Sequence, residues 1–446
     1  MKKKWFFVNK DGIVLDRSVG GVLLYIGWIR DSFMNCDTKN STCKRKKAIC
    51  LVLLVVLVGY FPSESRAAET GAKDYNIQAG PVEVKVSVGV KNTYSDNINL
   101  SEFERLDDFI ITPYAKIAAV WPMTQSNTLR VGLGISYNKH INHPEADSKA
   151  PILSPDSETG FNFEVRAGDF RFNLYDHISY QQDPIDDGAI SNSLNYGRFI
   201  NRAGIDGTWD LNDVELLLGF YQENYWSTSS EFDYLNRSTQ GVKGKASFEL
   251  GSETTAGVQG EGTLNDYNGD VQNDSQRLSV GPFVRSKLSE SVSVGAAAAL
   301  ELGQFDQGGL NGDQSDLFGY SFTGDVSHRL NRFFKHDLLV ARNVDLGVNS
   351  NFTEMWEARY NTAWNVIQNV QLGTTAFVEL GEDSGGFAGG LSAESYLRYG
   401  AGASVGYAWT KHFTSSLSYL YTEKNSDLFR RDYYQNKITL DLRYNF

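Results

Sequence analysis

Cysteine is almost missing from this chain. Its three cysteines, Cys36, Cys43 and Cys50, all lie within the first fifty of 446 residues. The rest of the chain therefore has no disulfide framework and no thiolate metal site. Proline is also scarce, with 9 residues against 42 Gly, 23 Tyr and 26 Phe. This composition favours strands joined by turns over helices.

Two further absences narrow the class of protein. After residue 61 no segment approaches the roughly eighteen consecutive apolar residues of a membrane-spanning helix. An excess of positive charge is also absent, because the formal net charge is −12 at pH 7. A nucleic-acid partner needs a basic surface, so we expect none.

The N-terminal part has the pattern of a secretory signal. A basic stretch, Lys44–Lys47, precedes an apolar run over 48–61 and small residues at Ser65 and Ala67. This pattern predicts cleavage after Ala67. An uncleaved membrane anchor is the alternative. Met34 is a candidate start, so residues 1–67 are expected to be an N-terminal extension followed by the signal. Their removal leaves 30 basic and 49 acidic residues, a net charge of −19.

Alternation with a period of two dominates the remaining chain. The segments Val82–Val90, Leu129–Tyr137 and Ile438–Phe446 carry an apolar or aromatic side chain at every second position. One face of each predicted strand is thus apolar, and the other is charged or small. A soluble β-sandwich also alternates, so this pattern alone leaves both folds open.

The connections between the predicted strands fall into two classes, short and long, which alternate along the chain. Short turns are expected near residues 123–125, 168–169, 211–212, 252–253, 289–290, 331–332, 368–369 and 411–412. Longer polar loops are expected near residues 95–107, 141–158, 183–195, 227–237, 266–274, 305–317 and 381–394. Segments of about ten residues with short turns at one end and long loops at the other are typical of outer-membrane barrels.

These observations predict an all-β fold. It is a transmembrane antiparallel up-and-down β-barrel of about 18 strands, with 16 to 20 allowed by a missed or extra hairpin. The barrel is expected over residues 82–446, after a short periplasmic segment at 68–81. The predicted location is the outer membrane of a bacterial cell.

Aromatic residues occur where the two membrane–water interfaces should lie. The predicted interface residues are Trp121, Trp209, Trp226, Trp356, Trp364, Trp409 and Phe413. Tyr444 and Phe446 end the last strand on its outer face, as in many outer-membrane barrels, and are predicted to form the signal for the barrel-assembly machinery.

Charged residues on the other face predict a polar lumen. The candidate pore-lining residues are Glu83, Lys85, Arg130, Glu164, Arg166, Arg171, Arg202, Glu215, Lys243, Lys245, Glu249, Arg285, Glu357, Arg359, Asp441 and Arg443. About eighteen strands enclose an aqueous channel unless something fills it. Opposed charges across a pore orient polar solutes. The alternative is that these charges pair with one another and only fill space.

Four residues fit this barrel poorly. Pro113 and Pro282 each lie within a predicted strand and remove a ladder hydrogen bond, so bulges or strand ends are expected there. Strict alternation places Asp176 on the outer face, which predicts a register shift nearby. Alternation does not settle the orientation of Arg342.

The first predicted hairpin resembles a known family. It contains Val86–Val90, then Tyr94–Leu100, then Asp107–Ile111, and Trp121-Pro122 before a short turn. This succession resembles the type-two β-barrel porin family, whose members are associated with exopolysaccharide production and secretion. The resemblance implies a barrel fold and a role in exopolysaccharide export, with polysaccharide-export components as partners. It supplies no catalytic residues.

No enzyme is predicted. Gly402–Gly406 matches the G-x-S-x-G nucleophile pattern but lies within a predicted strand, whereas that motif needs a strand–turn–helix context. His140 and His143 lack a third ligand, so neither a metal nor a cofactor is expected. A barrel hydrolase using His177 and Ser179 is the least favoured alternative.

Two other functions remain for the predicted barrel. The favoured function is a porin or channel, and a conduit for exopolysaccharide is one form of it. The alternative is a non-conducting structural or surface-binding barrel. In either case the expected partners are outer-membrane lipid and lipopolysaccharide.

Overall fold

The computed structural model describes residues 8–9, 12–13, 75–154, 159–183, 188–385 and 393–446. The chain divides into two compact units, Met1–Tyr60 and Phe61–Phe446. In the first unit the described residues form a small sheet of β1 (Val8–Asn9) and β2 (Gly12–Ile13). The predicted signal sequence and its cleavage site lie outside the described residues.

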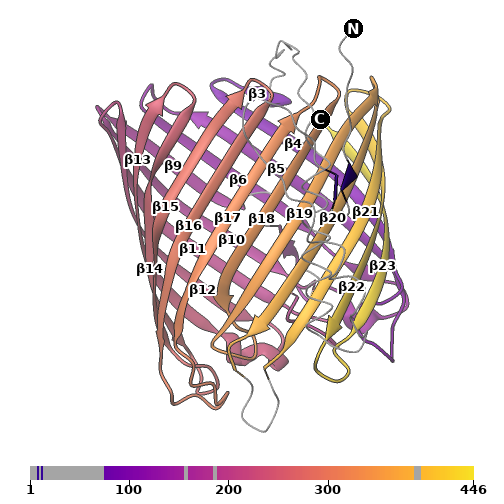
Figure 1. Ribbon diagram of the computed structural model, residues 1–446. Coiled ribbons are helices and arrows are strands. Elements are labelled where there is room, and N and C mark those ends of the chain that lie inside the picture. The colour runs from indigo at the N-terminus through magenta and orange to yellow at the C-terminus, as the bar shows by residue number, and fades with distance from the viewer. Residues whose placement is uncertain (1–7, 10–11, 14–74, 155–158, 184–187, 386–392) are drawn as a thin grey trace. The chain divides into compact units, whose positions relative to one another are not determined.

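The second unit is a closed antiparallel β-barrel (Figure 1). Three short strands, β3 (Ile77–Ala79), β7 (Lys139–His140) and β8 (Ile152–Leu153), pair with the wall strands. The wall is formed by β4 (Val82–Ser95), β5 (Asp108–Pro122), β6 (Asn127–Ser136), β9 (Gly160–Ala167), β10 (Phe170–Gln181), β11 (Arg198–Asp210), β12 (Val214–Ser227), β13 (Arg237–Gly251), β14 (Thr254–Tyr267), β15 (Ser275–Ser289), β16 (Val292–Phe305), β17 (Leu317–Arg329), β18 (Phe334–Leu346), β19 (Phe352–Ile367), β20 (Val370–Asp383), β21 (Ser395–Ala408), β22 (Phe413–Ser426) and β23 (Tyr433–Asn445).

These are eighteen wall strands in the part of the chain that the structure describes, as predicted. Each strand pairs with its neighbour in the chain, and β23 closes the barrel against β4, from Lys437↔Ser95 to Asn445↔Ser87. Closure leaves no open sheet edge, which a membrane would not tolerate. Among the described residues, the 3-10 helices η1 (Pro144–Ala146) and η4 (Ser230–Leu235) lie in connections.

All eight predicted short turns are present between the observed strands, at one end of the barrel that we call the turn end. The seven predicted longer loops lie at the other end, the loop end. Two connections there were not predicted, at residues 347–351 and 427–432. Both connections are short, so neither has the long polar stretch by which the other loops were recognised in the sequence.

The outer face of the barrel is apolar. Leu218, Leu250 and Leu288 lie on this face with exposed fractions of 67 %, 68 % and 66 %. Such exposure is costly in water but favourable against lipid acyl chains. Among the described residues, no helix has the length and apolarity to span a membrane.

The predicted interface aromatics lie on the outer face by register. The six tryptophans among them are all exposed, and Trp364 pairs across β18–β19 with Phe334 near the turn end. At the end of β23, the rings of Tyr444 and Phe446 meet edge to face with centroids 5.2 Å apart. The Phe446 backbone N–H donates to the carbonyl of Val86, so this residue extends the closing seam.

The two unusual prolines interrupt ladders without shifting the register. Opposite Pro113, β6 ends at Ser136 and pairing resumes with the short β7. Pro282 leaves a gap in the β15–β16 ladder between Val280↔Leu300 and Phe283↔Ala297. The gaps in pairing follow from the missing proline N–H. However, β5 and β15 continue through their prolines without a shift in register, so the bulges or strand ends predicted in these two strands are wrong.

The register shift predicted near Asp176 is wrong. The β10–β11 ladder is continuous from Phe170↔Trp209 to Gln181↔Arg198, and it contains the pair Asp176↔Ala203. Asp176 does lie on the outer face, where it accepts a hydrogen bond from Asn201 Nδ2. A local polar pair thus compensates for the carboxyl group, and no change of register is needed.

Candidate pore lining and mouth

Alternation along each strand positions the lumen-facing side chains. The observed register places every predicted pore-lining residue on the face opposite the exposed apolar residues. For example, Arg359 on β19 lies opposite Phe377 of β20, whereas its outward neighbour Tyr360 lies opposite Ala376. Because successive side chains point to opposite faces, one correct residue fixes the orientation of the whole strand.

Ion pairs connect many of these charges, both within a strand and between strands. Arg130 Nη1 lies 3.4 Å from Glu164 Oε2, and Arg166 Nε lies 2.7 Å from Glu164 Oε1. Farther round the wall, the Arg202 guanidinium lies 3.6 Å from Glu223 and 3.7 Å from Glu261. The wall therefore presents both signs of charge.

One deeply buried ion pair on the lumen face was not among the predicted residues. Arg398 Nη1 on β21 lies 2.6 Å from Glu379 Oε2 on β20, with side-chain exposures of 8 % and 6 %. Arg359 Nη2 approaches the other oxygen of Glu379 at 3.8 Å. The alternation of β20 and β21 places both residues on the lumen face, so the signal was present. Their burial is a tertiary property.

A loop crosses the mouth at the loop end. Residues 188–197 precede β11, yet they contact the β22–β23 connection on another part of the rim. Ser191 Oγ donates to the carbonyl of Arg431 at 3.0 Å, and Asn192 Nδ2 donates to that of Arg430 at 2.7 Å. Four wall strands, β4, β5, β6 and β9, separate these segments in the sheet. The loop therefore spans part of the opening.

A buried lysine holds this loop to the wall. Lys424 Nζ on β22 lies 2.8 Å from Glu394 Oε1 and 3.2 Å from Ser191 Oγ, and its side chain has no exposed surface. Its ammonium group also lies 4.7 Å from the centre of the Tyr396 ring. Arg431 Nη2 adds a second cation 3.0 Å from Glu394 Oε2.

The tip of the β18–β19 hairpin also reaches across the mouth. The carbonyl of Val348 accepts a hydrogen bond of 2.8 Å from Gln272 in the β14–β15 loop. The Val348 side chain belongs to a buried apolar cluster with Ala189, Ile190 and Phe232. Residues from three loops that are remote in the sheet thus pack together, which narrows the opening at this end.

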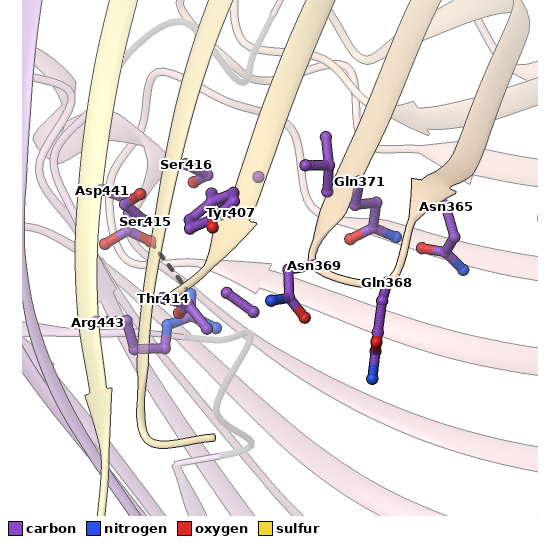
Figure 2. A pocket seen from close by; sticks show the side chains of 13 residues that line it. Asn365, Gln368, Asn369, Gln371, Tyr407, Thr414, Ser415, Ser416, Asp441 and Arg443 are labelled. Atoms are coloured by element: carbon purple, nitrogen blue, oxygen red, sulfur yellow. Dashed lines mark hydrogen bonds and ion pairs between the residues drawn. The ribbon is translucent and has the colours of Figure 1, made fainter. Parts of the chain in front are cut away.

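A polar depression of about 430 Å³ lies near the turn end, between β20, β21, β22 and β23. Figure 2 shows Asp441 and Arg443 on β23 next to Thr414 and Ser416 of β22. Arg443 Nη2 lies 3.2 Å from Asp441 Oδ2. Asp441 also accepts a hydrogen bond of 2.8 Å from the Tyr114 hydroxyl. Two predicted pore-lining residues therefore border this depression.

The residues weighed for catalysis or metal binding are used in other contacts. The ring Nδ1 of His140 lies 3.0 Å from Asp108 Oδ2, and that of His143 lies 3.0 Å from Glu145. His177 Nε2 lies 3.0 Å from Asn162 Nδ2 in the lumen wall. In the described ranges, no three His, Cys, Asp or Glu residues form a group that could hold a metal ion.

The chain is similar in fold to solved porin structures. A BenF-like porin from Pseudomonas fluorescens Pf-5 matches with a TM-score of 0.48 and 10 % identity, covering 82 % of this chain and 99 % of that one. The outer membrane protein opdK from Pseudomonas aeruginosa matches with a TM-score of 0.46 and 10 % identity, over the same shares of the two chains. OccAB3 from Acinetobacter baumannii matches with a TM-score of 0.46 and 9 % identity, covering 81 % and 99 %.

Comparison with protein-family models gives no match, and comparison with curated proteins gives none either. The resemblance to the type-two β-barrel porin family therefore stays a prediction. The similarity to solved structures concerns the barrel fold alone. That fold, a closed barrel of eighteen strands with an apolar exterior and a charged lumen, defines a β-barrel protein of the bacterial outer membrane.

Proposed function

We propose that this barrel is a passive channel for small polar solutes. The observation that carries the proposal is a lumen wall with charges of both signs, beneath a mouth that the protein's own loops narrow. Arg202 between Glu223 and Glu261, with 38 % of its side chain exposed, is an example of such a charge facing the lumen. Solutes with polar groups would find partners along this wall, whereas large solutes would be excluded at the mouth.

Export of exopolysaccharide is the finer function that the family resemblance implies. It rests on that resemblance alone. The contacts of Ser191 and Asn192 across the mouth favour small solutes over a thick polymer. A non-conducting barrel is the second candidate, and the same loop contacts support it. We propose no enzymatic activity, because the His177 Nε2 that a hydrolase would need as a base lies 3.0 Å from the side-chain amide of Asn162.

The proposal is tested by single-channel recording of the refolded full chain in a planar lipid bilayer. Stable conductance steps are expected. Added oligosaccharides of increasing length should block them only up to a limiting size. If long polysaccharides also enter and interrupt the current, the export function is favoured. If protein with the gel mobility of a folded barrel gives no steps, the channel proposal is wrong.

A substitution in the lumen provides a matched test of the pore. Arg202→Gln removes a cation from the wall and leaves Glu223 and Glu261 without it, so the reversal potential in a salt gradient should shift towards cation selectivity. Arg332→Gln, which removes a cation from a turn outside the lumen, should leave the selectivity unchanged. Equal shifts in the two variants would show that the wall does not line the conducting path.

A further inference from the structure

The ladder between β17 and β18 is incomplete. Pairing extends from Arg329↔Lys335 to Phe322↔Arg342 and ends there. Both strands continue towards the loop end, since β17 pairs with β16 up to Leu317 and β18 pairs with β19 up to Leu346. The two strands therefore separate while each remains part of a sheet. Unpaired backbone groups in a membrane wall cost several kcal/mol each, so other contacts must compensate for this split.

Beyond the split, the β18–β19 hairpin lies behind β16 and β17 on the lumen side. Val344 and Phe352 of the hairpin pack in a buried cluster with Phe305 and Leu317. Phe305 and Leu317 alternate with lipid-facing residues and so belong to the lumen face of β16 and β17. Arg277, also lumen-facing on β15, donates a hydrogen bond of 2.6 Å to the Val344 carbonyl. Here the β18–β19 hairpin overlaps the lumen side of β16 and β17, and no backbone ladder joins β17 to β18.

Arg342 closes the split at its apex. It is the last residue of β18 that pairs with β17, and its side chain is 8 % exposed. Its guanidinium donates to the backbone carbonyl of Tyr320, two residues beyond the last pair on β17. It also lies 2.5 Å from Glu354 Oε2 and 4.2 Å from the centre of the Tyr320 ring. The Arg342 side chain thus donates the hydrogen bond that a backbone N–H of β18 would donate to Tyr320 in a complete ladder.

An apolar depression of about 420 Å³ lies on the outer face beside this split. Tyr320 and Phe322, which flank the apex, line it together with Pro282, where the β15–β16 ladder is interrupted. The remaining lining residues are Val280, Ala298, Ala299, Leu300, Ser321 and Trp356. The depression is continuous with the lipid-facing surface, so hydrocarbon chains are the material that reaches it in a membrane.

We propose that the β17–β18 seam is a lateral passage for the hydrocarbon tail of an amphiphile, between the bilayer and the lumen. Apolar side chains lie on both sides of the seam, lining the depression outside and packed together inside in the buried cluster around Leu317, whereas other parts of the lumen wall carry charges. Arg342 is the latch that closes the passage, because its guanidinium donates across the seam to the Tyr320 carbonyl of β17, and Glu354 of the same hairpin holds that guanidinium in place. This passage goes beyond the proposed axial channel and does not depend on it.

Quenching by lipid tests the proposal in the full chain, with Cys36, Cys43 and Cys50 replaced by Ser. A fluorophore is attached at Leu317→Cys, inside the seam, and the protein is refolded into vesicles of phosphatidylcholine with brominated acyl chains. Bromine quenches on contact, so quenching reports entry of acyl chains. At Leu317→Cys we expect at least twice the quenching seen at Thr239→Cys. Adding Arg342→Ala should increase it further.

Thr239 is the matched control, because it is also buried near the loop end but lies between complete ladders with β12 and β14. Leu300→Cys, on the outer face, sets the value for full lipid contact. Gel mobility reports folding of each variant, and Glu354→Gln weakens the latch by removing the carboxylate that holds the Arg342 guanidinium if Arg342→Ala does not fold. Quenching at Leu317→Cys that stays equal to that at Thr239→Cys, with the latch intact and with it broken, would overturn the proposal.

Discussion

Arg398 and Glu379 form a buried pair whose two charges depend on each other. Arg398→Met alone leaves the Glu379 carboxylate buried without its nearest cation, so we expect the free energy of unfolding to fall by about 3–5 kcal/mol. The double variant Arg398→Met/Glu379→Met should recover most of this loss. Urea unfolding in detergent micelles, followed by tryptophan fluorescence, measures both.

Lys335 and Asp337 provide the control for this prediction. Their side chains are 48 % and 42 % exposed, with 3.0 Å between Lys335 Nζ and Asp337 Oδ1. Lys335→Met should therefore change the stability by less than about 1 kcal/mol. If Arg398→Met has an effect as small as this, the lumen pair is hydrated and the structural argument for its burial is wrong.

Asp274, in the connection before β15, links stability to pH. Burial raises the pKa of its carboxyl group, and the nearby Asp266 and Asp306 raise it further. The folded state then binds a proton at a higher pH than the unfolded state does. Stability therefore falls as pH rises from the unfolded pKa through the folded one, and it increases again on acidification.

Comparing Asp274→Asn with the natural chain isolates this effect. The amide oxygen can still accept the hydrogen bond of 2.7 Å from the Tyr267 N–H. The variant should be the more stable of the two at neutral pH, and the difference should shrink as pH approaches 4. Urea unfolding at a series of pH values gives the difference, and a difference that does not change with pH would contradict the assignment to Asp274.

At the scale of elements, the loop across the mouth depends on Lys424. Lys424→Met removes the ammonium group that joins Glu394 to Ser191, so residues 188–197 should leave the wall more often. We expect several-fold faster cleavage within this loop by a protease added outside proteoliposomes. Open segments are cleaved in proportion to their population.

Lys139→Met is the matched control, because Lys139 pairs with Asp147 in a different, more exposed connection. It should leave cleavage within residues 188–197 unchanged. Equal cleavage of Lys424→Met and the natural chain would mean that Arg431 and the apolar cluster around Ile190 hold the loop without the lysine.

The elements themselves were largely predictable. The position of each strand, and the face to which each of its side chains points, follow from the alternation of apolar and polar residues. That alternation depends only on neighbouring residues in the chain. The β18–β19 hairpin is the exception, since its pattern near Arg342 did not fit either face. The structure explains why: beyond Arg342 the hairpin leaves the ladder with β17, and Val344 packs against the lumen side of the wall. By register Arg342 lies on the outer face, opposite Phe322 and Trp356, but its side chain is buried because it turns into the split.

At the scale of the whole molecule, closure depends on the β23–β4 seam. Phe446 contributes the final backbone hydrogen bond of that seam, to Val86, and its ring packs on Tyr444. Deletion of Phe446 should therefore leave the protein in the periplasm and sensitive to protease. Fractionation of the cell envelope measures this, and Phe429→Ala, a change at an exposed aromatic residue in a loop, is the control. A normal outer-membrane yield after the deletion would contradict a role in assembly.

Alternation and connection length in the sequence predict about eighteen strands, the turn and loop ends and the face on which each charged residue lies, although the connections at residues 347–351 and 427–432 are missed. These properties are local, because alternation and connection length are set within a dozen residues. Which charges pair, which loops cross the mouth and where the wall splits depend on how remote segments pack in the folded barrel. Ser191 and Arg431, which contact each other at the mouth, are 240 positions apart in the chain. Such contacts arise from closure of the barrel, which brings remote segments to one rim and leaves no trace in either segment's own pattern.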